Sequence, residues 1–89
     1  MATISADILA RYAGDAAQEV PGVRGLVGRR AVRVSENGDG VTVELHLGVD
    51  WGVSMPDVGR EVQRRVGEYL LRMADLESVR VDVVVDDVE

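Results

Sequence analysis

The stretch Asp50-Trp51-Gly52-Val53-Ser54-Met55-Pro56 separates two hydrophobic patterns of different period, and these patterns decide the fold. Before it, residues 41–49 are apolar at every odd position, which predicts a half-buried β-strand. After it, apolar residues recur every three or four positions, which predicts an amphipathic helix over about 55–73. Ser54 is suited to cap this helix, and Pro56 fits its first turn, where a missing N–H costs nothing. The stretch is therefore the turn between a strand and a helix.

A further period-two run, Val79 to Val85, follows the helix and predicts another strand. Connections from strand through helix to parallel strand are almost always right-handed. On the helix itself, the spacing predicts the ion pairs Glu61–Arg65 and Glu68–Arg72. The sequence leaves open which earlier strand lies beside this last one.

The first part of the chain predicts another helix, which begins after Ser5 and ends before Pro21. Ile8, Tyr12 and Ala16 form the centre of its apolar stripe. Small residues flank this stripe, so we expect the two helices to touch closely near Gly59.

Between the helix and the first long strand the chain is rich in glycine. Residues 23–28 are expected to form a link without secondary structure, and residues 29–35 are expected to form a strand. A hairpin turn over 36–40 follows, because Asn37-Gly38 is the strongest short hairpin signal.

Together these elements predict one domain over residues 1–89, of order αββαβ. The fold class is α/β (α+β), a two-layer sandwich with a three-stranded mixed sheet and two helices on one face. The parity of the strands fixes which side chains should face the helices. The expected strand residues are Val43, Leu45, Leu47, Val81, Val83 and Val85, packed on Ile8, Tyr12, Val62, Val66 and Leu70.

Composition excludes several classes of function. The 89 residues include no cysteine, so disulfides and thiolate metal sites are ruled out. The formal net charge of −6 disfavours tight binding to phosphate backbones or anionic lipid. No apolar run approaches the length of a membrane span, so direct membrane insertion is not expected.

Several blocks of the sequence resemble one family in the same order along the chain. Glu19-Val20-Pro21-Gly22-Val23 follows an alanine-rich helix, and Trp51-Gly52-Val53-Ser54-Met55-Pro56 is similar to a Tyr-Gly-Val-Ser-Ile-Pro block. The family is the alkaline shock protein, or envelope stress response, family of Gram-positive bacteria. Further matches are Val58, Val62-Gln63, Val66, Met73, Leu76 and Asp86-Asp87-Val88.

The resemblance implies a non-enzymatic bacterial protein that is cytoplasmic and associates with itself. It also implies a position near the membrane, reached through a separate membrane-anchored partner, and a contribution to cell-envelope homeostasis. The family provides no catalytic residues and no cofactor, so none is expected here.

The titratable residues agree with a protein that is not an enzyme. His46 is the single histidine, and Glu44 lies on the same strand face, but no nucleophile completes a catalytic set. A solvent-facing histidine is the favoured interpretation. Glu44, Asp50, Asp82, Asp86 and Asp87 could be oxygen ligands, but no calcium-binding loop is present, and no metal site is expected.

An alternative function is a small KH-like domain that binds single-stranded RNA. Gly22-Val23-Arg24-Gly25 has the form of a KH loop, and four arginines lie between residues 24 and 33. However, a KH loop joins two helices, whereas this one joins a helix to a strand, and no aromatic platform accompanies it. We therefore expect no nucleic-acid partner.

Three apolar residues lie outside or at the rim of the expected core. Leu71 falls opposite the apolar stripe of its helix, and Val84 shares a strand face with charged residues. Trp51 lies on a short loop, where it is either a lid on the core or an interface anchor. Trp51, Leu71 and Val84 are therefore the candidate residues for self-association, which we expect to involve the uncovered face or edges of the sheet.

Overall fold

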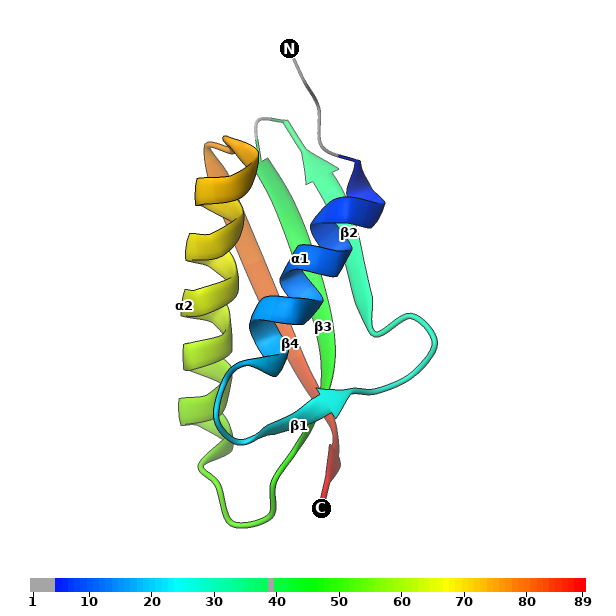
Figure 1. Ribbon diagram of the computed structural model, residues 1–89, viewed down its shortest axis with the longest axis vertical. Helices are drawn as coiled ribbons and strands as arrows, with labels where there is room; N and C mark the ends of the chain where they lie inside the picture. The colour runs from blue at the N-terminus through cyan, green and yellow to red at the C-terminus, as the bar shows by residue number, and fades with distance from the viewer. Residues whose placement is uncertain (1–4, 39) are drawn as a thin grey trace.

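The computed structural model describes residues 5–38 and 40–89, and it consists of a helix layer packed on one face of a β-sheet (Figure 1). Asp39, in the predicted hairpin turn, lies outside the described residues. The elements in chain order are α1 (Ala6–Gln18), β1 (Val23–Leu26), β2 (Val32–Asn37), β3 (Gly40–Val49), α2 (Met55–Ala74) and β4 (Ser78–Val88).

Strand β3 is the centre of the sheet. β4 pairs with it in parallel along one edge, while β2 and β1 both pair with it antiparallel along the other. The predicted two-layer mixed fold is confirmed, and the last strand lies beside β3. Because β4 follows β3 through α2, the parallel pairing places the crossover helix over the sheet (Figure 1).

The described residues form a sheet of four strands, so the expectation of three is wrong. Val23–Leu26 forms β1, although this segment was expected to be an irregular link. β2 pairs with β3 only as far as Val32, which lies opposite Leu45. β1 pairs with the backbone groups at the end of β3, with Val23 opposite Val49.

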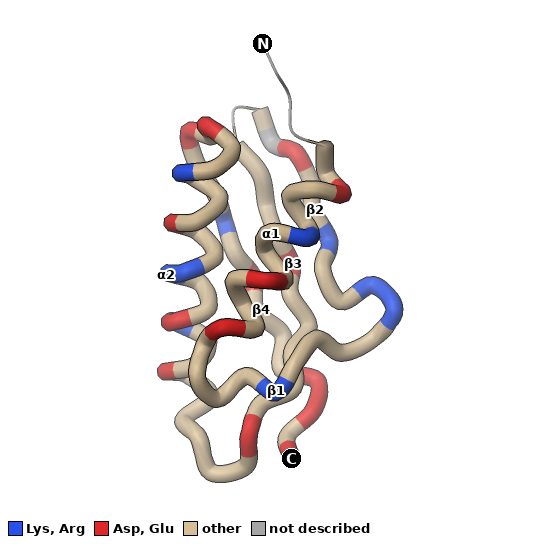
Figure 2. Tube along the Cα trace, viewed as in Figure 1, with Lys and Arg blue, Asp and Glu red and all other residues tan. Residues whose placement is uncertain are grey.

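The loop between β1 and β2 was expected to be the start of a strand. Val27 N–H donates to the carbonyl of His46, and His46 N–H donates to the carbonyl of Ala31. The chain therefore leaves the sheet between these two contacts. Arg29 and Arg30 lie on this exposed excursion (Figure 2).

The predicted parity of the core strands is confirmed. Val43, Leu45 and Leu47 are fully buried, whereas Glu44 and His46 on the alternate face are only half-buried. Val62, Val66 and Leu70 of α2 are also fully buried, and Val81 is buried while Val83 and Val85 pack partly against the core.

The core face of α1 differs in part from the prediction. Tyr12 and Ala16 pack partly against the core as expected, but Ile8 is 45% exposed, and the buried residues are Leu9, Ala13, Gly14 and Ala17. Gly14 lies close to the sheet, because a Cβ at this position would be only 3.2 Å from Leu26 Cδ1. The helix therefore packs the side that carries Gly14 on the sheet, and Ile8 lies away from the core.

The two helices meet at tyrosines. Tyr12 and Tyr69 contact edge to face, with ring centroids 5.8 Å apart. A Cβ at Gly59 would have no neighbour within 4 Å, so the predicted contact at that glycine is wrong. The helices therefore contact each other through two large rings and not through the small residues that were expected to meet.

The ends of α2 follow the sequence signals. Ser54 accepts a hydrogen bond from Asp57 N–H, as its predicted role as N-cap requires, and Pro56 lies in the first turn. Farther along α2, Gln63 donates from Nε2 to the carbonyl of Val81 on β4, at 3.0 Å. The helix is therefore tied to the outer strand by a side-chain contact as well as by packing.

Candidate functional site

Trp51 lies on the loop between β3 and α2, and its side chain is 82% exposed. Its backbone N–H donates to the carbonyl of Glu89 at 2.7 Å, so the end of β4 holds the loop in place. Gly52 takes φ +91, a conformation that glycine adopts easily and that reverses the chain directly after the tryptophan. Of the two alternatives for Trp51, the lid on the core is excluded.

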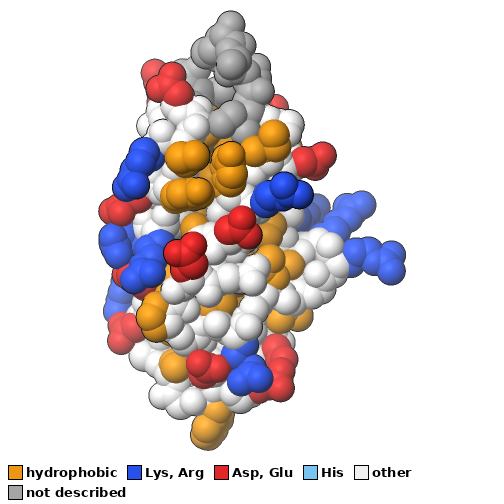
Figure 3. All heavy atoms as spheres, in the orientation of Figure 1, with side chains coloured by type: hydrophobic (Ala, Val, Ile, Leu, Met, Phe, Trp, Pro, Cys, Tyr) orange, Lys and Arg blue, Asp and Glu red, His pale blue; other side chains and the backbone are white. Residues whose placement is uncertain are grey.

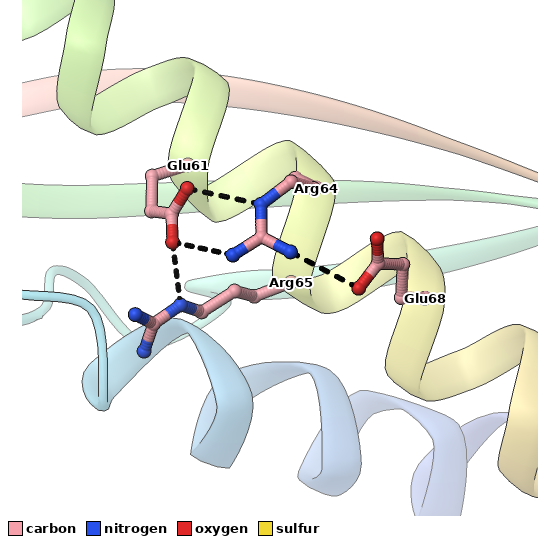
Figure 4. Close-up of polar contacts among 4 residues, drawn as sticks. All are labelled: Glu61, Arg64, Arg65 and Glu68. Atoms are coloured by element: carbon pink, nitrogen blue, oxygen red, sulfur yellow. Dashed lines mark hydrogen bonds and ion pairs between the residues drawn. The ribbon is translucent and has the colours of Figure 1, made fainter.

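Leu71 is 40% exposed on the outward side of α2. It neighbours an ion-pair network in which Arg64 and Arg65 both donate to Glu61 (Figure 4). These hydrogen bonds, first from Arg64 and then from Arg65, lower the pKa of Glu61 to about 2. The predicted Glu61–Arg65 pair is present, but Glu68 pairs with Arg64 and not with the predicted Arg72.

Val84 is 37% exposed on the sheet face that no helix covers, opposite His46 in the β3–β4 register. The structure does not bring the three candidate residues together. Trp51 lies near Met55, the first residue of α2. At a rise of 1.5 Å per residue, Leu71 lies about 24 Å from Met55 along the helix axis. Val84 lies on the other side of the sheet. They therefore belong to three separate surfaces.

His46 lies on the open sheet face with a carboxylate at each of its ring nitrogens. Its Nε2 lies 2.6 Å from Glu44 Oε2, and its Nδ1 lies 2.6 Å from Asp86 Oδ2. Both ring nitrogens can donate to carboxylates at the same time only when the imidazole is protonated. The hydrogen bond with Glu44, and then that with Asp86, raises the pKa of His46.

Asp86 lies at a bulge in β4. Leu47 is opposite Val85, but Gly48 is opposite Asp87, so Asp86 is the extra residue on its strand. The sequence indicated Glu44 as a neighbour of His46 but not Asp86. Within residues 5–38 and 40–89, no group of three or more histidine, aspartate or glutamate side chains is arranged to hold a metal ion.

The KH-like motif takes a different structure from a KH loop. Gly22 is in a turn, and Val23 to Gly25 belong to β1, where they pair with β3. Arg24 also contacts Asp50, with Nη1 3.4 Å from Oδ1. The motif is therefore part of the sheet, and one arginine of the basic stretch already has an acidic neighbour.

These observations describe a small α/β domain with exposed apolar side chains on several surfaces and one histidine bridged by two carboxylates. The chain belongs to the alkaline shock protein family, and the model of this family matches residues 1–89. The family's description is a cell envelope-related function. It is 30% identical over 95 residues to the uncharacterised protein YqhY of Bacillus subtilis (strain 168), covering 90% of this chain and 70% of that protein.

Solved structures show the same fold. One form of the MamM CTD has a TM-score of 0.67 at 23% identity, covering 93% of this chain and 95% of that one. A copper form of the MamM CTD has a TM-score of 0.64, also at 23% identity, covering 91% of this chain and 86% of that one. In the described part of this chain, neither helix has the length and apolarity needed to cross a membrane.

Proposed function

We propose that this protein is a non-enzymatic interaction module that associates with itself and docks to a membrane-anchored partner, and so contributes to the cell-envelope stress response. The observation that carries the proposal is the 82% exposure of Trp51. A tryptophan gains much from burial at an interface, and it is enriched among the residues that dominate binding energies. The match to the alkaline shock protein family supports a role at the envelope.

The bonding of His46 supports a role without catalysis. Both ring nitrogens are occupied by carboxylates, so the histidine has no free nitrogen with which to act as a general base. The contact with Asp86 joins β3 to β4, and we assign His46 a structural role.

The net charge supports indirect attachment to the membrane. A formal charge of −6 opposes binding to the anionic inner leaflet of a bacterial membrane. We therefore propose a cytoplasmic position in which a membrane-anchored protein holds the domain near the bilayer, with the Trp51 loop as its docking contact.

The test is the recovery of the tagged domain from cells of the native bacterium, fractionated with membranes retained. We expect the wild type to sediment with the membrane fraction and to be released by detergent. Trp51→Ala should remain in the soluble fraction. Met55→Ala is the matched control, because Met55 is also exposed, at 49%, and lies close in sequence to the same loop. Equal recovery of the wild type and Trp51→Ala with membranes would contradict the docking contact.

A further inference from the structure

The helix layer presents an apolar end beyond the contact of Tyr12 with Tyr69. Ile8 lies one turn before Tyr12 on α1, and Met73 lies one turn after Tyr69 on α2. The helices run in opposite directions, so both residues lie beyond the same side of the tyrosine pair (Figure 1). They are 45% and 43% exposed, and Figure 3 shows hydrophobic side chains gathered where α1 begins and α2 ends. We call Ile8 and Met73 the apolar end.

On the opposite side of the tyrosine pair the helix layer is hollowed. The hollow has a volume of about 220 Å³, and Ala16 and Tyr69 provide its apolar lining. Its charged lining consists of Asp15, Glu19, Arg65, Glu68 and Arg72. This volume is below the roughly 300–1,000 Å³ of small-molecule sites, but it is large enough to receive aliphatic side chains. We call this groove the hollow end.

Both ends carry free charges. Among the described residues, Arg11, Asp7 and Asp75 near the apolar end have no ion-pair partner, and the same is true of Asp15, Glu19 and Arg72 at the hollow end. Arg65 and Glu68, by contrast, are already engaged by Glu61 and Arg64. Arg11 at the apolar end and Asp15 and Glu19 at the hollow end are therefore among the charges available to a partner.

We infer that the helix layer is the surface through which two copies of this chain associate, with a two-fold axis close to the Tyr12–Tyr69 contact. Such an axis places the apolar end of each copy on the hollow end of the other. Ile8 and Met73 then enter the partner's groove, and Arg11 approaches the partner's acidic residues. An isologous interface requires one surface to carry both complementary halves, as this one does. The inference rests on the proposed self-association and names its surface.

The absence of cysteine makes this geometry directly testable by disulfide trapping. We expect Met73→Cys mixed with Ala16→Cys to give a crosslinked heterodimer on mild oxidation. Leu71→Cys mixed with Ala16→Cys is the control, since Leu71 faces away from the tyrosine pair. Met73→Cys alone should crosslink poorly, because the two-fold axis separates its copies by more than the ~7 Å between Cα atoms that a disulfide spans. Equal crosslinking in the control mixture would overturn the geometry.

Light scattering gives an independent measurement on the cysteine-free chain. Met73→Glu should raise the dissociation constant of the dimer at least about tenfold, because a charge would enter the apolar contact. Leu71→Glu should leave it unchanged, and circular dichroism should show both variants folded. A dimer weakened by Leu71→Glu or Val84→Asp but not by Met73→Glu would refute the helix-layer surface and leave the proposed self-association standing. A wild type that is monomeric at ~100 μM would refute both, whereas docking to membranes is decided separately by Trp51→Ala.

Discussion

One carboxylate oxygen of Asp86 lies 2.6 Å from Nδ1 of His46, although the two residues are 40 positions apart in the chain. Glu44 holds the other ring nitrogen at the same distance. The imidazole therefore links β3 to the bulge of β4, and both contacts are hydrogen bonds at the same time only when the ring is protonated.

The link predicts that the protein loses stability as the solution becomes alkaline. The pKa of His46 is raised in the folded state above its ordinary value of about 6.5, because Glu44 and Asp86 accept hydrogen bonds from the protonated ring. Its contribution is fully present below pH ~6.5 and is lost as the pH rises through the higher folded pKa. Urea unfolding between pH 6 and 9 should show the free energy of unfolding falling over this range.

The matched variant is His46→Gln, which cannot titrate. Its free energy of unfolding should be lower than that of the wild type at pH 6 and should change less between pH 6 and 9. If the two proteins showed the same pH dependence, the loss would belong to other groups.

Neighbouring leucines on α2 predict opposite outcomes of the same substitution. Leu70 is fully buried in the core, so Leu70→Ala should cost about 2–5 kcal/mol of unfolding free energy. Leu71 is 40% exposed, and Leu71→Ala should change the stability of the monomer by no more than about 0.5 kcal/mol. Thermal unfolding of both variants at low protein concentration compares them. Similar losses would mean that the helix is rotated from the position described.

A close backbone approach predicts that Gly40 tolerates no side chain. A Cβ at this position would collide with the hydroxyl and carbonyl oxygens of Ser78, its register partner on β4. Gly40→Ala should therefore destabilise the protein by about 1–3 kcal/mol or more, in the range of overpacked core sites. Gly67→Ala is the control, because a Cβ there meets nothing within 4 Å and alanine favours the helix by up to about 1 kcal/mol. The two variants should shift the melting temperature in opposite directions.

The charge distribution predicts no useful affinity for RNA or DNA. The net charge of −6 repels phosphate, and Arg24 is already close to Asp50. We expect no binding tighter than ~10 μM at physiological salt in filter assays with mixed single-stranded RNA. Binding tighter than ~10 μM that Arg29→Glu abolished would instead restore the RNA-binding alternative.

Much of the fold was predictable because strand parity and helix capping are local properties. The alternation over residues 41–49 identified the buried face of β3, and Ser54 with Pro56 located the start of α2. β1 was not predictable, since Val23–Leu26 has no alternation of its own and forms a strand only because β3 has backbone groups to satisfy there.

The candidate site was predictable only in part. The choice between Ile8 and Leu9 as the core residue of α1 depends on how closely Gly14 approaches Leu26, which is a tertiary contact. The partner of His46 depends on the strand order and on the bulge in β4, neither of which a single strand reveals. The exposure of Trp51 required the loop geometry, because a lone aromatic on a loop packs either inward or outward.

The contact between Gln63 and the carbonyl of Val81 has a consequence for solubility. The outer edge of β4 has no neighbouring strand among the described residues, and such edges recruit strands from other molecules into growing sheets. The Gln63 amide occupies a backbone acceptor of β4 from the side of α2. A strand arriving from another molecule would have to displace it to pair at Val81. Many copies crowded together are therefore less prone to aggregate by extending one another's sheets.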